Sequence, residues 1–166
     1  MRDQERAAGG SDTFSKHMKA IQDLYPDDFS HCFGCGNRNA SGHQLKSYVE
    51  GESVVARFTP SPHHMSVPGF VYGGLLASLV DCHAMATAAS SEIVDNLAPR
   101  FVTAVLHVEY LKPTPLGTEL EIHGRVTERS ARKAIVDLTI IAGGVVTVRA
   151  NAVAVRIPKS MESTTV

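Results

Sequence analysis

The chain has 166 residues, enough for one domain with a buried core, and its 43% hydrophobic and 20% charged residues are an ordinary globular balance. A net charge of −1 gives no electrostatic basis for binding nucleic acid or an anionic membrane surface, and no apolar run is long enough to span a membrane. Three cysteines without a secretory signal predict reduced thiols and a cytoplasmic location.

The first third of the chain predicts a tail, a turn-rich segment and a hairpin. Residues 1–28 are predicted to be a polar tail with a short helical segment, where apolar side chains recur at positions 14, 18, 21 and 24. Glycines and asparagines fill residues 31–42, which predicts turns. Residues 44–50 and 53–59 indicate two strands, and residues 61–69, with two prolines, indicate a loop.

One strong helix and four strands follow. Residues 73–93 place Leu75, Leu79 and His83 on one apolar face of a helix. After residue 99 the pattern changes to alternating or apolar runs rich in β-branched residues, which predicts strands at 101–111, 119–128, 134–141 and 145–157. Gly143 and Gly144 predict a tight hairpin between the last two.

This order of elements predicts an α+β fold in a single domain at residues 29–158, followed by a C-terminal tail at 159–166. A single long helix must bury its apolar face on the antiparallel sheet, and a long sheet curls around it because strands twist with a fixed hand. Such a sheet leaves one face and its edges uncovered in a monomer. We therefore expect the chain to form a homodimer.

Asp81 occupies a distinctive position on the predicted helix. At about 100° per residue, it lies almost opposite the apolar face. Its neighbours there are Ala77, Ala84 and Ala88, whose small side chains leave room for a ligand or another surface. Helical spacing alone favours a solvated acid over a catalytic one.

A resemblance to a known family changes that balance. The stretch from Pro68 to Asp81, PGFVYGGLLASLVD, resembles the signature of hotdog thioesterases related to the phenylacetate-pathway (PaaI-type) enzymes. In that family a His-Gly-Gly opens the central helix, and a carboxylate follows nine positions after the His. The segment CFGCG at residues 32–36 and the segment YLKP at residues 110–113 also resemble the family. The similarity covers roughly residues 29–157.

The resemblance implies a hotdog fold, in which a long antiparallel sheet wraps around one central helix, and a homodimer or homotetramer. It also implies hydrolysis of an acyl-CoA to free CoA and a carboxylic acid, with no cofactor beyond the CoA thioester substrate. Thioester hydrolysis needs an activated nucleophile and a group that stabilises the developing oxyanion. By the resemblance, Asp81 is the base or nucleophile, supplied by the other subunit, and Thr103 orients the attacking water.

Gly73 and Gly74 are expected at the start of the helix. Backbone N–H groups there lack intrahelical partners, and the helix dipole adds positive potential at the same place. A thioester carbonyl docked on the Gly74 amide would therefore be polarised without a charged side chain, and glycine permits the close approach.

Two positions depart from the family pattern. Tyr72 stands where the family has His, and Ser66 stands where it often has Asn. A tyrosine can donate one hydrogen bond but cannot shuttle protons near neutral pH. This leaves open a protein that binds acyl-CoA without hydrolysing it. A hotdog hydratase is disfavoured because no Asp-x-Asn-Pro segment occurs.

Further substrate contacts are expected from His64 and from a basic cluster. His64 precedes the helix and is a candidate for the site entrance, although a solvated loop histidine is the simpler interpretation. CoA phosphates need basic groups. The cluster at the turn between the second and third of the last four strands comprises Arg129, Arg132 and Lys133, and a solvated turn explains it equally well.

The cysteines are expected to hold no metal. Cys32 and Cys35 have the C-x-x-C spacing of metal ligands, but zinc takes four ligands and no second C-x-x-C occurs. A glycine-rich turn that packs small thiols against the end of the helix is the favoured interpretation. Cys82 is expected to be a buried structural thiol, and His83 a hydrogen-bonded core histidine.

Overall fold

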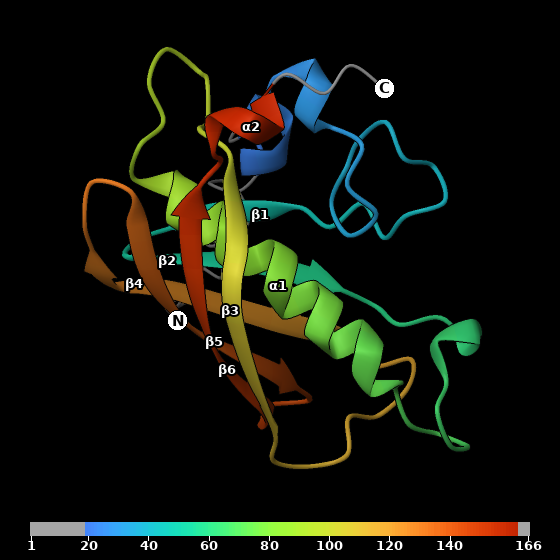
Figure 1. Cartoon of the computed structure of the whole chain (residues 1–166). Helices are drawn as coiled ribbons and strands as arrows, with labels where there is room; N and C mark the ends of the chain where they lie inside the picture. The colour runs from blue at the N-terminus through green and yellow to red at the C-terminus, as the bar shows by residue number, and fades with distance from the viewer. Residues whose placement is uncertain (1–18, 163–166) are drawn as a thin grey trace, which may run out of the picture.

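A six-stranded antiparallel sheet and one long helix organise residues 19–162, the part of the chain that the computed structural model describes (Figure 1). The helix, α1, spans Gly73–Ser90. The strands are β1 (Ser47–Glu50), β2 (Ser53–Phe58), β3 (Phe101–Tyr110), β4 (Leu120–Arg129), β5 (Lys133–Ala142) and β6 (Val145–Arg156). Short helical elements are η2 (Ile21–Leu24), η3 (Asp27–Phe29), η4 (Pro62–His64) and α2 (Lys159–Glu162).

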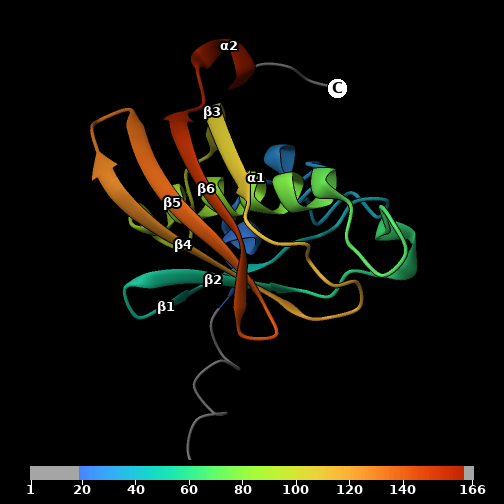
Figure 2. The same ribbon diagram turned by 90° about the horizontal axis from the view of Figure 1, so that it is seen from below.

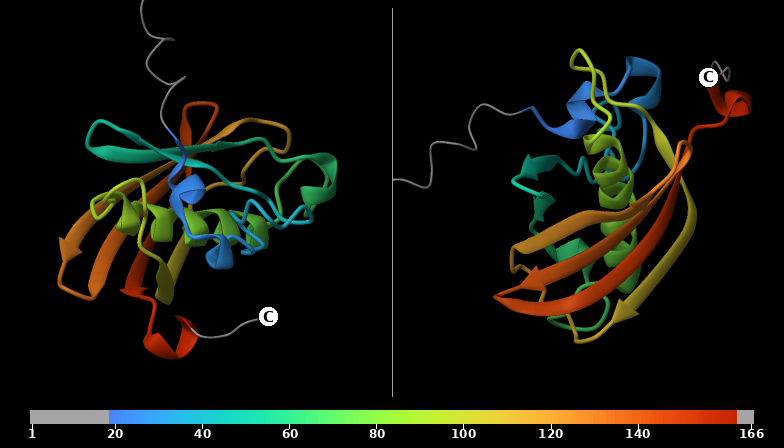
Figure 3. Two further views of the ribbon diagram at one scale, coloured as in Figure 1. Left: turned by 90° about the horizontal axis from the view of Figure 1, so that it is seen from above. Right: turned by 90° about the vertical axis from the view of Figure 1, so that its left-hand side faces the viewer.

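The strand order in the sheet is β1-β2-β4-β5-β6-β3. The strand that follows the helix therefore crosses to the far edge and pairs with β6, so that β1 and β3 are the two edges. The sheet curves around α1, which lies on its concave side (Figures 2 and 3). This is the hotdog arrangement, and the expected fold class is confirmed.

The helix is buried on more sides than one apolar face would require. Leu75 and Leu79 are buried as expected, but Ala84 and Ala88, on the face predicted to leave room, are also fully buried. The segment with η2 and strand β1 also packs against α1, alongside the rest of the sheet. The 18 residues of α1 are mostly apolar or small, in keeping with this burial. Asp81 and His83 are the only ionisable side chains in the helix apart from the thiol of Cys82.

Element boundaries agree with the predictions to within a few residues, with two differences. The helix ends at Ser90 rather than near residue 93. The predicted C-terminal tail begins with the helical turn α2. Positions 21 and 24 of the predicted helical segment lie in η2, and positions 14 and 18 lie outside the described residues. The Gly143-Gly144 hairpin is confirmed, with φ values of +55° and +77° that favour glycine at both central positions.

His83 joins a buried polar network. Its Nε2 lies 3.0 Å from the Val54 carbonyl oxygen, so that nitrogen carries the proton, and its Nδ1 accepts from the Ser47 hydroxyl at 2.8 Å. Gln22 donates to the Ser47 oxygen at 2.9 Å and accepts from the Ser47 backbone N–H at 2.8 Å. Burial lowers the pKa of His83 to about 4. The prediction of a hydrogen-bonded core histidine is confirmed.

Among the helices in residues 19–162, none has both the length and the apolar character needed to cross a membrane.

Candidate active site

The centre of the candidate site is a contact between the middle of α1 and the edge strand β3. The Thr103 hydroxyl donates a hydrogen bond to Asp81 Oδ1 at 2.5 Å. The pairing of β3 with β6 shifts register between Thr103 and Val105, so a bulge lies at this point of the strand. Asp81 is partly exposed and Thr103 is exposed. One carboxylate oxygen is therefore held by the hydroxyl, and the other is left to face a ligand.

The start of α1 offers unpaired backbone donors. The Tyr72 carbonyl accepts from the Leu75 and Leu76 N–H groups at 3.1 and 3.4 Å. The N–H groups of Gly73 and Gly74 have no hydrogen-bond acceptor within residues 19–162. The positive end of the helix dipole lies at the same place. These amides can accordingly bind an oxygen that carries negative charge.

Tyr72 lies across this helix start. A Cβ atom added to Gly74 would come within 2.4 Å of the Tyr72 ring and hydroxyl. Glycine at position 74 thus lets the exposed Tyr72 phenol lie against the helix start, and a larger residue there would displace the phenol. The phenol occupies the region where the family signature has an imidazole, and it provides one donor there.

A cavity of about 460 Å³ opens beside the first turn of α1. Its lining includes Ser66 and Gly73, which were predicted to bind substrate, together with Leu76, Tyr110 and Lys112. The Tyr110 hydroxyl donates to the Gly73 carbonyl at 2.9 Å, which connects the end of β3 to the helix start. The predictions did not include Tyr110 among the site residues, because only the topology shows that β3 ends beside α1. Asp81 does not line this cavity.

His64 lies in a different hollow. Its Nδ1 accepts from the Ser61 backbone N–H at 3.1 Å, and its ring packs against His43 and Phe58. These residues line a second cavity of about 420 Å³. Burial, with the neighbouring histidines, lowers the pKa of His64. Only the backbone of His64 reaches the helix start, where its carbonyl accepts from the Tyr72 N–H at 2.8 Å.

Arg129 binds the C-terminal end of α1, a contact that was not predicted from the sequence. Its Nη2 donates to the Ala88 carbonyl at 2.6 Å, its Nη1 pairs with Glu92, and its side chain is only 27% exposed. The Ala88 carbonyl is in the last turn of α1, where carbonyl groups lack helical partners. Arg129 thus caps the C-terminal end of the helix, at the opposite end from Gly73.

Arg132 and Lys133 are exposed, and neither side chain has an ion-pair partner within residues 19–162. They share the β4–β5 turn with Arg129. Since α1 is about 27 Å long at 1.5 Å per residue, this turn is remote from the Gly73 end of the same chain. The structure therefore brings Ser66, Tyr72, Gly73 and Gly74 together and joins Asp81 to Thr103, but it places the basic turn apart from both groups.

The model of the thioesterase superfamily matches residues 68–151, which include Asp81, Thr103 and the start of α1. The chain belongs to the thioesterase superfamily. Rat acyl-coenzyme A thioesterase THEM4 is 33% identical over 87 residues, which are 52% of this chain and 35% of that protein. The chain therefore matches only about a third of the length of this curated relative.

Solved structures resemble this chain in sequence or in fold. A thioesterase superfamily protein from Shewanella loihica is 44% identical, with a TM-score of 0.62 over 80% of this chain and 98% of that chain. Escherichia coli PaaI is 15% identical, with a TM-score of 0.60 over 70% and 81% of the two chains, and supports the fold alone. The same holds for a Streptococcus mutans protein solved with acetyl CoA, which is 21% identical with a TM-score of 0.59 over 69% and 90%.

Proposed function

We propose that this chain hydrolyses acyl-CoA thioesters, with Asp81 as the catalytic carboxylate. The observation that carries the proposal is the hydrogen bond from Thr103 to Asp81, which orients a carboxylate on an otherwise apolar helix. Membership of the thioesterase superfamily supports the reaction class. The name of the rat relative and the acetyl CoA bound to the Streptococcus mutans protein support a CoA thioester as substrate.

In the reaction, Asp81 removes a proton from a water molecule while the water oxygen attacks the thioester carbonyl carbon. Thr103 donates to Asp81, and its oxygen retains a lone pair that can accept a hydrogen bond from the same water. The carbonyl oxygen gains negative charge and binds the Gly74 N–H at the positive end of the helix. The C–S bond of the tetrahedral intermediate then breaks, the CoA thiolate takes the proton that Asp81 removed from the water, and the carboxylic acid is released. Attack by Asp81 itself, followed by hydrolysis of an anhydride, uses the same groups.

The two halves of this site must come from two copies of the chain. Gly74 and Asp81 are seven residues apart, which separates them by about 10 Å along the helix axis. The Gly74 N–H also points toward the N-terminal end, away from Asp81. One chain therefore cannot present both groups to one carbonyl. Two copies with antiparallel helices can, because each Asp81 then faces the partner's helix start.

Strand β3 is the edge through which such a pair can form. It carries Thr103 and exposes Val105 and Tyr110, each with 54% of its surface accessible. An edge strand presents unpaired backbone groups that a second copy can bind. Antiparallel pairing of two β3 strands would extend the sheet across a two-fold axis and bring both candidate sites to the interface.

The substrate-binding roles divide between two regions. The cavity lined by Ser66, Gly73 and Lys112 is suited to the acyl or pantetheine part of the substrate, since its walls are mainly apolar with polar groups at the rim. We assign the CoA phosphates to Arg132 and Lys133 of the second copy, because within one chain this turn is remote from the Gly73 end of α1. Arg129 is left out because it is already bound to Glu92 and the Ala88 carbonyl.

One observation favours a second candidate function, binding of acyl-CoA without turnover. The Tyr72 phenol lies against Gly74, where it can contact a docked carbonyl but cannot relay a proton near neutral pH. A protein with this arrangement could hold a thioester and report its presence to a partner.

Release of free thiol from a panel of aliphatic and aromatic acyl-CoAs separates the two functions. We expect turnover by the wild type and a loss of about 100-fold or more in Asp81→Asn, the scale for removing a positioned base. Asp137→Asn is the matched control, because Asp137 is an exposed carboxylate on β5 that bonds only Asn151 among the described residues. Binding without any turnover would establish the second function, and unchanged turnover in Asp81→Asn would refute the role of Asp81.

A further inference from the structure

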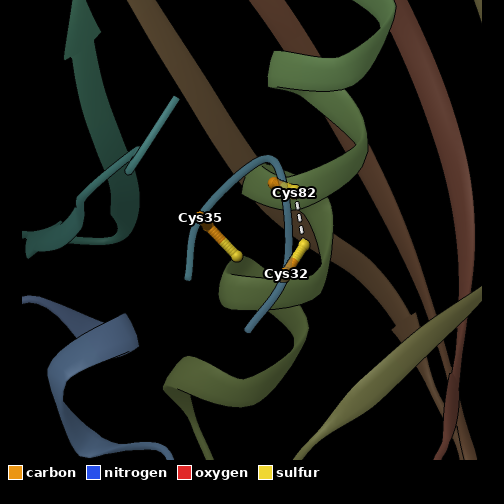
Figure 4. A group of neighbouring side chains, drawn as sticks. All are labelled: Cys32, Cys35 and Cys82. Carbon is orange, nitrogen blue, oxygen red and sulfur yellow. Dashed lines mark hydrogen bonds between the residues drawn. The ribbon is translucent and has the colours of Figure 1, made fainter. Parts of the chain in front are cut away.

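Three thiols converge beside the middle of α1. Cys32 and Cys35 come from the turn before β1, and Cys82 comes from the tenth position of the helix (Figure 4). The three sulfur atoms lie within 4.8 Å of one another, and those of Cys32 and Cys82 are 3.7 Å apart. All three cysteines are free thiols, two of them buried and Cys32 partly exposed.

The turn is shaped to bring these sulfurs against the helix. A Cβ atom on Gly34 would come within 2.2 Å of Cys82 Sγ, and one on Gly36 within 2.5 Å of the backbone around Cys32. Glycine at both positions therefore allows the turn to close and to touch the helix. The Gly36 N–H donates to the Cys32 carbonyl at 2.8 Å, which closes the turn.

The spacing of the sulfurs suits a tetrahedral thiolate site. With zinc–sulfur bonds of 2.3 Å, two thiolates of one tetrahedron lie about 3.8 Å apart. The distance of 3.7 Å between Cys32 and Cys82 meets this value, and the other two distances need shorten by no more than about 1 Å. Thiolate ligands select soft ions such as zinc over magnesium or calcium.

A buried positive charge lies beside the three thiols. The charge of Arg100 acts on Cys35, and Arg100 Nη1 is buried without a hydrogen-bond partner in the described part of the chain. A divalent ion with three thiolates carries a net charge of −1, which a neighbouring guanidinium offsets. The Arg100 side chain stacks on the Tyr25 ring at 4.7 Å and is held in place beside the cluster.

We propose that Cys32, Cys35 and Cys82 bind one zinc ion through three thiolates, with the fourth position open to solvent on the exposed side of Cys32. The C-x-x-C spacing alone argued against a metal because no second pair follows in the sequence. The fold supplies the third thiol from a helix far along the chain. The ion would fasten the segment before β1 to α1 at the residue next to Asp81, independently of the proposed hydrolysis.

Metal titration of the reduced, metal-stripped full chain tests the proposal. Zinc is added in competition with a chromophoric chelator, and cobalt is used as an optical probe whose thiolate charge-transfer band grows with the number of bound sulfurs. We expect one equivalent per chain, a cobalt spectrum of a tetrahedral three-thiolate site, and a rise in thermal stability with zinc, since an ion that binds only the folded state stabilises it.

Cys82→Ser and Cys32→Ser should each weaken zinc binding by at least 100-fold, while Asp81→Asn, one residue away on the helix, should leave it unchanged. Circular dichroism identifies any variant that does not fold, and Cys35→Ser then replaces it. Absence of zinc and cobalt binding by the reduced, folded wild type would overturn the proposal. Zinc binding that survives in Cys82→Ser would also overturn it. A Cys32–Cys82 disulfide in the purified protein would do the same if its reduction restored three thiols that bind no metal.

Discussion

Thr103 on the edge strand β3 donates its hydroxyl hydrogen to Asp81 on α1 at 2.5 Å, across 22 residues of chain. The contact joins the only carboxylate of the helix to the strand through which a second copy would bind. The hydroxyl holds one carboxylate oxygen, and the other has no hydrogen-bond partner among the described residues. The geometry of this pair, rather than the mere presence of an acid, supports catalysis.

Removal of the Thr103 hydroxyl should slow the reaction without abolishing it. In Thr103→Val the carboxylate loses a hydrogen bond worth about 1.5–3 kcal/mol, so we expect kcat to fall by roughly 10- to 100-fold with little change in KM. Thr103→Ser keeps the hydroxyl and should retain most of the activity. Steady-state thiol release from one good acyl-CoA substrate measures both variants. Equal activity in Thr103→Val and the wild type would show that Asp81 needs no orientation from β3.

Two arginines of the β4–β5 turn are expected to have different roles, Arg129 in stability and Arg132 in substrate binding. Arg129→Met removes the contacts with Glu92 and with the Ala88 carbonyl, so we expect the free energy of unfolding to fall by about 1–2 kcal/mol with KM unchanged. Arg132→Met should instead raise KM for acyl-CoA and leave stability unchanged. Denaturant unfolding and steady-state kinetics on the two variants provide the comparison. A raised KM in Arg129→Met with full stability would return Arg129 to the phosphate site.

The buried histidine predicts a loss of stability at mildly acidic pH. Burial lowers the pKa of His83 to about 4, whereas an unfolded histidine titrates near 6.5. Between these values the unfolded chain binds the extra proton, so the free energy of unfolding falls as the pH falls, by roughly 3 kcal/mol across the window. Above pH 6.5 both states are neutral at this residue, and the contribution is complete.

The free energy of unfolding in urea, measured at several pH values for the wild type and for His83→Gln, isolates this effect. The glutamine does not titrate, so the slope of unfolding free energy against pH should become smaller between pH 4 and 6.5, whatever the absolute stability of the variant. His31→Gln is the control, because His31 is exposed in the turn before β1, outside the β3 edge, and should leave the slope nearly as in the wild type. An unchanged slope in His83→Gln would contradict the assignment.

The fold could be predicted from the sequence because it depends on local patterns, whereas the candidate pair Asp81 and Thr103 came from the resemblance and not from those patterns. The helical period, the β-branched runs and the Gly143-Gly144 turn predicted a helix, strands and a hairpin that the structure contains. The hydrogen bond between Asp81 and Thr103 was not predictable, since it depends on a bulge in β3.

Contacts between distant segments were not predictable. The capping of α1 by Arg129 depends on where the β4–β5 turn lies relative to the helix end. The thiol cluster depends on the turn at residues 32–36 folding against the middle of α1 rather than its end. In both cases the residue types are visible in the sequence, but their partners are decided by the curvature of the sheet around the helix.

The composite site makes a prediction that mixed subunits can test. Asp81→Asn removes the carboxylate but keeps the Gly74 amide, whereas Gly74→Pro removes that amide at a position in the first helical turn where the backbone tolerates proline, once the exposed Tyr72 side chain has moved away from the added Cβ. Each homodimer should be nearly inactive. A mixed dimer pairs the intact Gly74 of one chain with the intact Asp81 of the other, so it regains one complete site.

Random association of equal amounts should then restore about a quarter of the wild-type activity, because half of the dimers are mixed and each has one working site of two. Co-expression with two affinity tags isolates the mixed dimer, for which thiol-release assays should give about half of the wild-type activity, since one of its two sites is complete. Mixing Asp81→Asn with Thr103→Val subunits is the control, because both changes fall on the half of the site that carries the carboxylate. One site of this mixed dimer lacks Asp81, and the other has only the milder Thr103→Val defect, so no site is complete. If the Asp81→Asn and Gly74→Pro mixture stayed inactive while both variants folded and associated, Asp81 and Gly74 would not act on the same thioester across the interface.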